Sequence, residues 1–311
     1  MKTIIKNGII RTNNLSKNYG PVKAVEQISL NVNKGEIYGF LGLNGAGKTT
    51  TIRMLLGMIK PTTGESYLKG EKVHAGRPEL WNSVGYLVEI PYSYPELTVR
   101  ENLEITRRLR FIKDASTVDS VIEKLKLTPY ADRKAKNLSL GNAQRLGLAK
   151  AMIHNPEILI LDEPSNGLDP AGIVEIRELL RDLAFNKGVT IFISSHILGE
   201  ITRIATRIGI IHEGRLIQEM DAEKLHQLRN KSLLIDLKDK NGAIALLVNG
   251  GFNATVNKDG LIEITSKNAV LRPENVNLNL VNAGFPPSML KVEEEDLESY
   301  FLRIIGEEGV V

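Results

Sequence analysis

The feature that most constrains this chain is a glycine-rich segment placed between a predicted buried strand and a predicted helix. Gly42–Thr49 fits the pattern G-x-x-x-x-G-K-[ST], and apolar spacing predicts a strand over Gly35–Leu43 and a helix over Lys48–Ile59. Glycines allow a tight turn whose N–H groups converge on phosphate oxygens, and the helix N-terminus favours anions. The segment therefore predicts a polyphosphate-binding loop, with Lys48 as its direct counter-charge and Thr49 as a hydroxyl ligand for Mg²⁺. The residues expected to bind are Asn44, Gly45, Ala46, Gly47, Lys48, Thr49 and Thr50.

Composition excludes several classes of protein. Among 311 residues, 40 Lys and Arg nearly balance 37 Asp and Glu, so no bulk nucleic-acid binding is expected. The chain has no cysteine, which excludes a disulfide scaffold, a cysteine nucleophile and a thiolate metal site. No apolar run approaches the roughly 20 residues that a membrane-spanning helix needs. If the protein works at a membrane, another chain must bring it there.

The order of predicted elements indicates two domains. Buried strands alternate with helices in the first part, which predicts a parallel sheet covered by helices, and a mostly helical stretch at about 95–155 resembles an insertion into that core. Residues 226–311 show the order β-α-β-β-α-β, which is typical of a small α+β, ferredoxin-like domain. We therefore expect domains at 1–225 and 226–311.

Two carboxylates follow the apolar strand predicted at Ile158–Leu161. Ligands of open α/β sheets lie beyond the carboxyl ends of the strands. Asp162 is therefore a candidate ligand of Mg²⁺ through water, and Glu163 is a candidate base that orients or deprotonates an attacking water. The alternative is a strand that simply ends in two solvent-facing acids. The presence of a phosphate-binding loop in the same chain favours the functional interpretation over this alternative.

The segment Leu138–Arg145, with the sequence LSLGNAQR, resembles the L-S-G-G-Q-x-Q-R signature of ABC-type ATPases. Further motifs of that family follow in the expected order: Tyr19 matches the aromatic that stacks on adenine, Pro164–Pro170 matches the D-loop, and His196 matches the switch histidine. The resemblance covers residues 10–225. It implies a RecA-like, phosphate-loop α/β core with an antiparallel N-terminal part, binding ATP with Mg²⁺ and using Lys48, Glu163 and His196 in hydrolysis.

The same resemblance implies that one chain is half of an active unit. Ser139, Gly141 and Asn142 would face the γ-phosphate of ATP held by a second subunit, so a homodimer or a paired ATPase subunit is expected. Ser139 is also a good candidate for the N-cap of the following helix, and both roles use the same donors.

Three departures from the family pattern indicate one branch of the family. Leu140 replaces glycine, Asn142 replaces glutamine, and Glu89 stands where the Q-loop glutamine is usual, all of which resemble the bacitracin and lantibiotic export branch. A carboxylate at Glu89 is a harder metal ligand than an amide, so we expect it to contribute to the Mg²⁺ site and to couple that site to a partner. The neighbouring Tyr92 and Tyr94 fit either a pocket for the partner or internal packing.

The resulting expectation is an ATP-hydrolysing subunit of an export-type ABC transporter. It would act on the cytoplasmic face of the cell membrane through a separate permease chain, with export of antibiotic or lantibiotic-type peptides, or immunity to them, as its task. The alternative is a soluble ABC ATPase that acts on ribosomes or DNA without transport.

Overall fold

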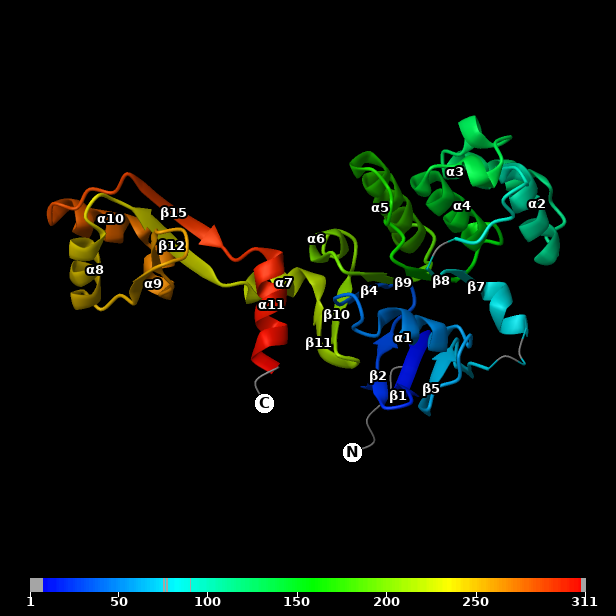
Figure 1. Ribbon diagram of the computed structural model, residues 1–311, viewed down its shortest axis with the longest axis horizontal. Helices are drawn as coiled ribbons and strands as arrows, with labels where there is room; N and C mark the ends of the chain where they lie inside the picture. Colours follow the sequence, from blue (N-terminus) through cyan, green and yellow to red (C-terminus); the bar gives the residue numbers. More distant parts are fainter. Residues whose placement is uncertain (1–7, 75, 77, 90, 309–311) are drawn as a thin grey trace. The chain divides into compact units, whose positions relative to one another are not determined.

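The computed structural model describes residues 8–74, 76, 78–89 and 91–308 (Figure 1). The chain divides between Ala222 and Glu223 into two compact units, which we describe separately.

The N-terminal unit is built on a six-stranded sheet with the strand order β11-β10-β4-β9-β8-β7. Five neighbouring strands are parallel, and β11 closes one edge as an antiparallel hairpin with β10. Every residue of β4, β8 and β9 is buried, as expected for parallel strands covered on both faces. The parallel core predicted from the sequence is confirmed. The β10–β11 hairpin is not among the predicted elements. The strands are β4 (Ile37–Leu41), β7 (Val84–Leu87), β8 (Ile158–Asp162), β9 (Thr190–Ser195), β10 (Arg207–His212) and β11 (Arg215–Asp221).

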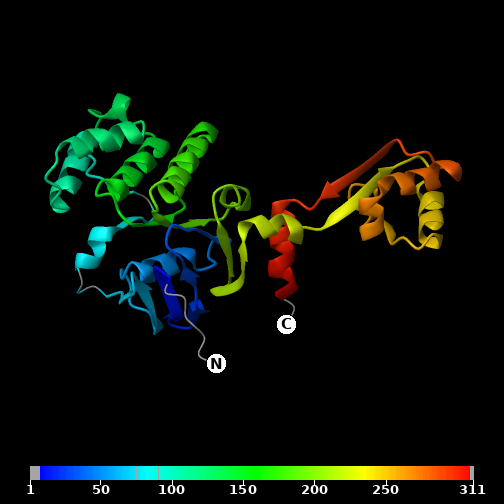
Figure 2. The same cartoon turned by 180° about the vertical axis from the view of Figure 1, so that it is seen from behind.

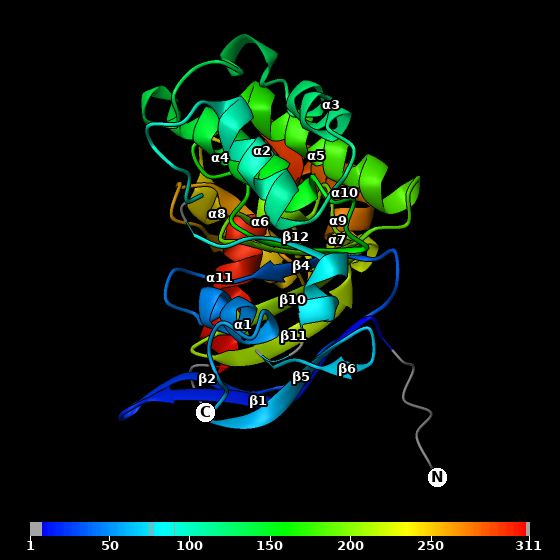
Figure 3. The ribbon, with the colours of Figure 1, turned by 90° about the vertical axis from the view of Figure 1, so that its right-hand side faces the viewer.

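A second, antiparallel sheet covers one side of this core. Helix α1 (Lys48–Leu55) lies between the two sheets, and its buried Ile52, Met54 and Leu55 join the apolar residues of both in one cluster (Figures 1 and 3). The sheet has the order β2-β1-β5-β6, with β3 paired to β1. Its strands are β1 (Ile10–Tyr19), β2 (Val22–Ile28), β3 (Asn31–Val32), β5 (Thr63–Leu68) and β6 (Glu71–Lys72).

Helices cover the other side of the six-stranded sheet (Figure 3). Three of them form the predicted helical insertion and extend over residues 99–152. The first begins at a capping box, in which the Thr98 side chain accepts a hydrogen bond from the Glu101 N–H and the Glu101 side chain accepts one from the Thr98 N–H. The helices are α2 (Val99–Leu109), α3 (Ser116–Lys124), α4 (Leu140–Met152), α5 (Pro170–Phe185) and α6 (Leu198–Ile201).

The C-terminal unit, coloured yellow to red in Figure 2, combines a sheet with helices. The sheet has four antiparallel strands in the order β13-β14-β12-β15. This order, together with the β-α-β-β-α-β succession, is the ferredoxin-like arrangement. The second helical segment is split into α9 and α10 because Pro273 cannot continue a helix. The elements are α7 (Leu225–Leu228), β12 (Lys231–Asp236), α8 (Lys240–Asn249), β13 (Ala254–Val256), β14 (Ile262–Ile264), α9 (Lys267–Leu271), α10 (Pro273–Asn282), β15 (Met289–Glu294) and α11 (Leu297–Glu308).

In the part of the chain that the structure describes, no helix has both the length and the hydropathy needed to cross a bilayer.

Candidate nucleotide site

The phosphate-binding loop connects the end of β4 to the first turn of α1. Gly47 directly precedes α1 with φ of 105°, in the left-handed region that glycine adopts most readily. A Cβ atom at this position would lie 2.5 Å from the carbonyl oxygen of Ala24. Glycine is therefore required at Gly47 both by the backbone conformation and by the close approach of the strand β2.

Lys48 folds back over the loop that precedes it. Its Nζ donates hydrogen bonds to the carbonyl oxygens of Gly42 at 2.7 Å and Leu43 at 3.2 Å. Nζ also forms an ion pair with Glu163 Oε1 at 3.2 Å, and the lysine side chain is only 6% exposed. The loop thus holds its cation at the carboxyl end of the sheet, next to the candidate base.

Asp162 uses both carboxylate oxygens. Thr49 Oγ1 donates to Oδ2 at 2.7 Å, and Ser194 Oγ donates to Oδ1 at 2.6 Å. Asp162 is 3% exposed and Ser194 is fully buried. The parallel pairing of β8 with β9 sets Asp162 beside Ser194, so the sheet register delivers the second hydroxyl.

Glu163 leaves the sheet in a left-handed conformation, with φ of 49°. Its N–H donates to Ser194 Oγ at 3.1 Å, and its carbonyl accepts from Gln144 Nε2 at 3.2 Å and from the Asn166 N–H at 3.1 Å. Non-glycine residues rarely adopt this conformation, which costs about 1–2 kcal/mol. The surrounding hydrogen bonds hold the residue there.

The Glu163 carboxylate lies between Lys48 and His196. Its Oε1 faces Lys48 Nζ, and its Oε2 lies 2.7 Å from His196 Nδ1. The side chain of Glu163 is 16% exposed, whereas that of His196 is 37% exposed. The three residues predicted to act in hydrolysis are therefore brought together, although they come from three separate segments of the chain.

These groups surround a cleft of about 290 Å³. Six of the seven predicted loop residues line it; the exception is Ala46, which is 5% exposed. The lining does not include five other predicted site residues, which are Tyr19, Glu89, Ser139, Gly141 and Asn142. Asp162 does not line the cleft either, but it is hydrogen-bonded to Thr49, which does. The lining comprises Ala24, Asn44, Gly45, Gly47, Lys48, Thr49, Thr50, Glu163, Asn166 and His196.

The cleft fits Mg²⁺ only together with phosphate. In the described segments, no three His, Asp or Glu side chains converge as a self-sufficient metal site. Thr49 and Asp162 offer two hard oxygen ligands. Mg²⁺ is usually held in this way, by one or two protein oxygens together with substrate phosphates and water.

The segment Leu138–Arg145 lies at the N-terminus of α4, on the surface. Ser139 caps the helix, since its Oγ accepts a hydrogen bond from the Asn142 N–H at 3.3 Å. The unusual Leu140 is 61% exposed and packs over Gly167, where a Cβ atom would lie 2.4 Å from Leu140 Cγ. Leu140 therefore connects this segment to the D-loop of the same chain.

Glu89 lines a groove and is not among the residues that line the nucleotide cleft. Its Oε1 is 2.6 Å from Arg53 Nη2, and its φ is 56°. Both residues line a groove of about 980 Å³ at the helical insertion, together with the exposed Tyr92, Tyr94 and Phe111. Lys150 also lines the groove, and its burial lowers the pKa of the ammonium.

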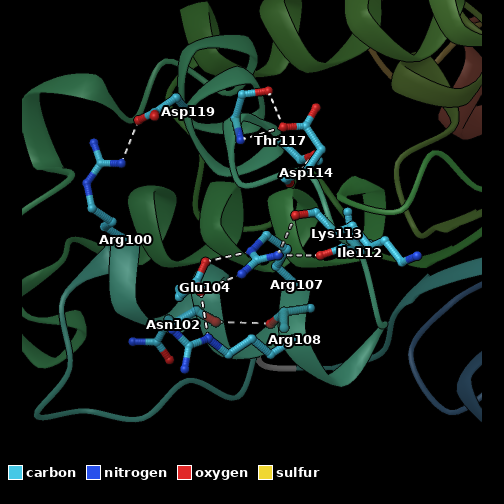
Figure 4. Close-up of polar contacts among 12 residues, drawn as sticks. Arg100, Asn102, Glu104, Arg107, Arg108, Ile112, Lys113, Asp114, Thr117 and Asp119 are labelled. Carbon is cyan, nitrogen blue, oxygen red and sulfur yellow. Dashed lines mark hydrogen bonds and ion pairs between the residues drawn. The ribbon is translucent and has the colours of Figure 1, made fainter.

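A polar cluster joins α2 to the turn that follows it (Figure 4). Arg107 forms a two-armed ion pair with Glu104 at 2.7 Å and donates to the carbonyl oxygens of Ile112 and Lys113. The hydrogen bonds from Arg107 and Arg108 lower the pKa of Glu104 to about 2. The cluster thereby fixes the turn that follows α2 and presents Phe111, which is 90% exposed.

Fold and site together define a nucleotide-hydrolysing enzyme of the phosphate-loop class. The sequence pattern of the ABC transporter family matches residues 25–166. The bacitracin transport ATP-binding protein BcrA of Bacillus licheniformis is 43% identical over 300 residues, which cover 96% of this chain and 97% of that protein. The chain belongs to the ABC transporter ATP-binding family, and it is an ATPase that binds ATP.

Two further comparisons agree with this assignment. The lantibiotic transport ATP-binding protein SrtF of Streptococcus pyogenes is 36% identical over 231 residues, which cover 73% of this chain and 99% of that protein. A dimeric ATP-binding cassette in a post-hydrolysis state, bound to ADP and Pi, superimposes with a TM-score of 0.64 at 25% identity and covers 68% of this chain. The family inferred from the segment Leu138–Arg145 is confirmed.

Sequence reasoning missed Ser194, Asn166 and Gln144 as residues of the site. Asn166 and Gln144 lie inside the D-loop and signature motifs, but no motif predicts their hydrogen bonds to the Glu163 backbone. Ser194 carries no local signal at all. Its place beside Asp162 follows only from the pairing of β8 with β9.

Proposed function

We propose that this chain powers the export of peptide antibiotics of the bacitracin or lantibiotic type, or immunity to them. The observation that carries the proposal is the 43% identity to a bacitracin transport ATP-binding protein along 96% of the chain. Glu89, Leu140 and Asn142 support the same branch, since they are the three departures from the common family pattern.

In this proposal the cleft residues divide the work of ATP hydrolysis. The backbone of Asn44–Thr50 and the ammonium of Lys48 bind the phosphates, while Thr49 and Asp162 hold Mg²⁺. The metal, when bound, neutralises charge on the phosphate oxygens. Glu163 accepts a proton from the attacking water, and His196 orients the Glu163 carboxylate, which its Nδ1 contacts at 2.7 Å.

A second cassette completes the site. Ser139, Gly141 and Asn142 bind the ATP of that second copy, which their position on the surface at the N-terminus of α4 supports. Tyr19 is 48% exposed near the end of β1 and stacks on adenine in the proposal. The dimeric cassettes among the solved structures favour this arrangement.

The permease is a separate membrane chain that binds in the groove around Glu89. A volume of about 980 Å³ and exposed aromatic side chains suit a short helix of a partner. Because Glu89 lines the groove and is bound to Arg53, it senses the partner directly, and its effect on the metal is indirect. The chain then acts at the cytoplasmic face of the membrane.

The test combines a physical and a biological readout. Tagged Glu163→Gln protein, which should remain closed on ATP, is purified from native membranes in mild detergent with Mg²⁺ and ATP. A stoichiometric polytopic membrane protein is expected, and recovery of only soluble dimer, ribosomes or DNA-bound proteins would contradict the transport proposal.

The cargo is tested in a strain that lacks the gene. Loss of the gene should increase susceptibility to bacitracin or to a lantibiotic, and leave susceptibility to a ribosome-directed antibiotic unchanged. The wild type and a Glu123→Gln control, which alters an exposed carboxylate on α3, should restore resistance. Restoration by Glu163→Gln would refute the role assigned to ATP hydrolysis.

A further inference from the structure

The strand β15 forms a free edge of the C-terminal sheet. Within the described residues it pairs only with β12 (Figure 1), so it is one of the two edge strands of this sheet. Three consecutive residues in it are exposed: Lys291 by 59%, Val292 by 39% and Glu293 by 47%. An exposed edge of six residues is a template for pairing with another strand.

The hydrogen-bond pattern shows which backbone groups face outward. The Glu295 N–H donates to the Asn230 carbonyl at 2.8 Å, and the Asn230 N–H donates to the Glu295 carboxylate at 2.9 Å. Because the register pairs Lys231 with Glu294, the backbone of Glu295 faces Asn230. In antiparallel sheets hydrogen-bonded pairs alternate with pairs that are not hydrogen-bonded. The N–H and C=O groups of Leu290, Val292 and Glu294 therefore point away from β12, toward the free edge.

The charges on this edge are complementary to themselves. If two copies of β15 pair antiparallel with Val292 opposite the second copy's Val292, each Lys291 lies opposite a Glu293. Centring the pairing on Glu294 would instead set Glu293 against Glu295, and centring it on Leu290 would leave Lys291 opposite Met289. Only the register centred on Val292 forms two cross-strand ion pairs and uses the outward-facing backbone groups.

Within one chain Lys291 and Glu293 already form an ion pair at 2.7 Å. In the paired register each of them also lies opposite its counterpart in the second copy, and opposite charges placed across two strands attract. Val292 adds a second reason: it is on the same sheet face as Leu233 and Leu290, which are in or against the core, yet it remains 39% exposed. A second copy would cover it.

We propose that the C-terminal unit is a dimerisation unit, in which β15 of two chains pairs antiparallel about Val292 and joins two four-stranded sheets. This contact does not need ATP, and it does not depend on the cargo or the permease. Because the interface is one strand wide, it is weak in free solution. It becomes effective when a complex already holds two cassettes at high local concentration.

Disulfide trapping tests the contact in the full chain, which has no cysteine of its own. Two hydrogen-bonded antiparallel residues have Cα atoms about 5.5 Å apart, within the range of about 4.4–6.8 Å that a disulfide bridges. Because a disulfide accumulates even a weak and transient contact, Val292→Cys should form a covalent dimer under mild oxidation, with EDTA and no nucleotide. Val256→Cys is the matched control, since Val256 is 51% exposed on β13, at the opposite edge of the sheet.

Charge reversal in the Val292→Cys background decides whether the register is right. Lys291→Glu and Glu293→Lys should each slow dimer formation about tenfold, because each places like charges opposite one another at two symmetric positions. The double variant K291E/E293K restores both ion pairs and should restore the rate. Equal trapping of Val292→Cys and Val256→Cys would overturn the proposal, as would a double variant no faster than the single ones.

Discussion

Replacing Ser194 by alanine tests how the two carboxylates of the cleft are held. The hydroxyl is fully buried, donates to Asp162 Oδ1 at 2.6 Å and accepts from the Glu163 N–H at 3.1 Å. A hydrogen bond to a charged group contributes about 1.5–3 kcal/mol, and a neutral one about 0.5–1.5 kcal/mol. The Glu163 N–H keeps a second acceptor, the Ser194 carbonyl at 3.3 Å, so its share is small. We expect a loss of about 2–4 kcal/mol in the free energy of unfolding.

The neighbouring Ser195 is the matched control. It is 2% exposed, and its Oγ accepts a hydrogen bond from the Ile197 N–H at 3.0 Å. Ser195→Ala should cost about 1 kcal/mol. Urea unfolding followed by fluorescence reports on the N-terminal unit, because the only tryptophan, Trp81, lies in it. Ser194→Thr keeps a hydroxyl and should retain most of the stability.

Hydrolysis provides a second readout that simple destabilisation would not move. If Ser194 orients Asp162, Ser194→Ala should raise the Mg²⁺ concentration needed for half-maximal ATP hydrolysis, and Ser195→Ala should not. Equal losses of stability in the two alanine variants, with the same dependence on Mg²⁺, would refute the reasoning.

Three other outcomes follow from the same structure. Glu163→Gln should lower ATP hydrolysis by about 10²–10⁴ while nucleotide binding persists, and unimpaired turnover would exclude it as the base. Burial lowers the pKa of His154 to about 4, below its ordinary value near 6.5, so the folded state favours the neutral ring. The stability that comes from this pKa difference is complete above about pH 6.5 and is lost as the pH falls toward 4. Over that range the urea midpoint of His154→Gln should therefore fall less steeply than the midpoint of the wild type. Parallel curves for the two proteins would contradict the lowered pKa of His154. Gly167→Ala should lower the Tm, because φ is +77° at this position and the new Cβ would clash with Leu140. Adding Leu140→Ala should recover only the part of the loss that the clash causes. If nothing is recovered, backbone strain alone is responsible.

The fold was predictable wherever a pattern is local and repeated. Gly42–Thr49 joins a strand to a helix as its spacing indicates, and the buried strand before Asp162 was recognised from its apolar run. The β10–β11 hairpin has a local signal that the prediction did not use: Glu213 and Gly214, both at positive φ, form a two-residue turn between the paired His212 and Arg215. The break between α9 and α10 depends on Pro273. The helix before it, α9, has five residues, which are too few to show a helical periodicity of apolar residues in the sequence.

The candidate site was predictable in composition but not in arrangement. Lys48, Glu163 and His196 were each assigned from motifs, and the structure brings them together. The ion pair between Glu89 and Arg53 could not be predicted from a motif. It depends on the backbone at φ of 56°, which presents the carboxylate to Arg53 in the groove; a contribution of Glu89 to the Mg²⁺ site stays a prediction.

The sequence by itself determined the class of enzyme, because a phosphate-binding loop and the segment Leu138–Arg145 are contiguous and need only local backbone geometry. Only the tertiary structure decided which groups meet across the chain. The bond from Ser194 to Asp162 depends on the order of strands in a sheet, and the self-complementary edge at Val292 depends on which strand lies outermost. Such contacts join residues far apart in the chain, and their selection depends on the packing of the whole core, which no short segment encodes.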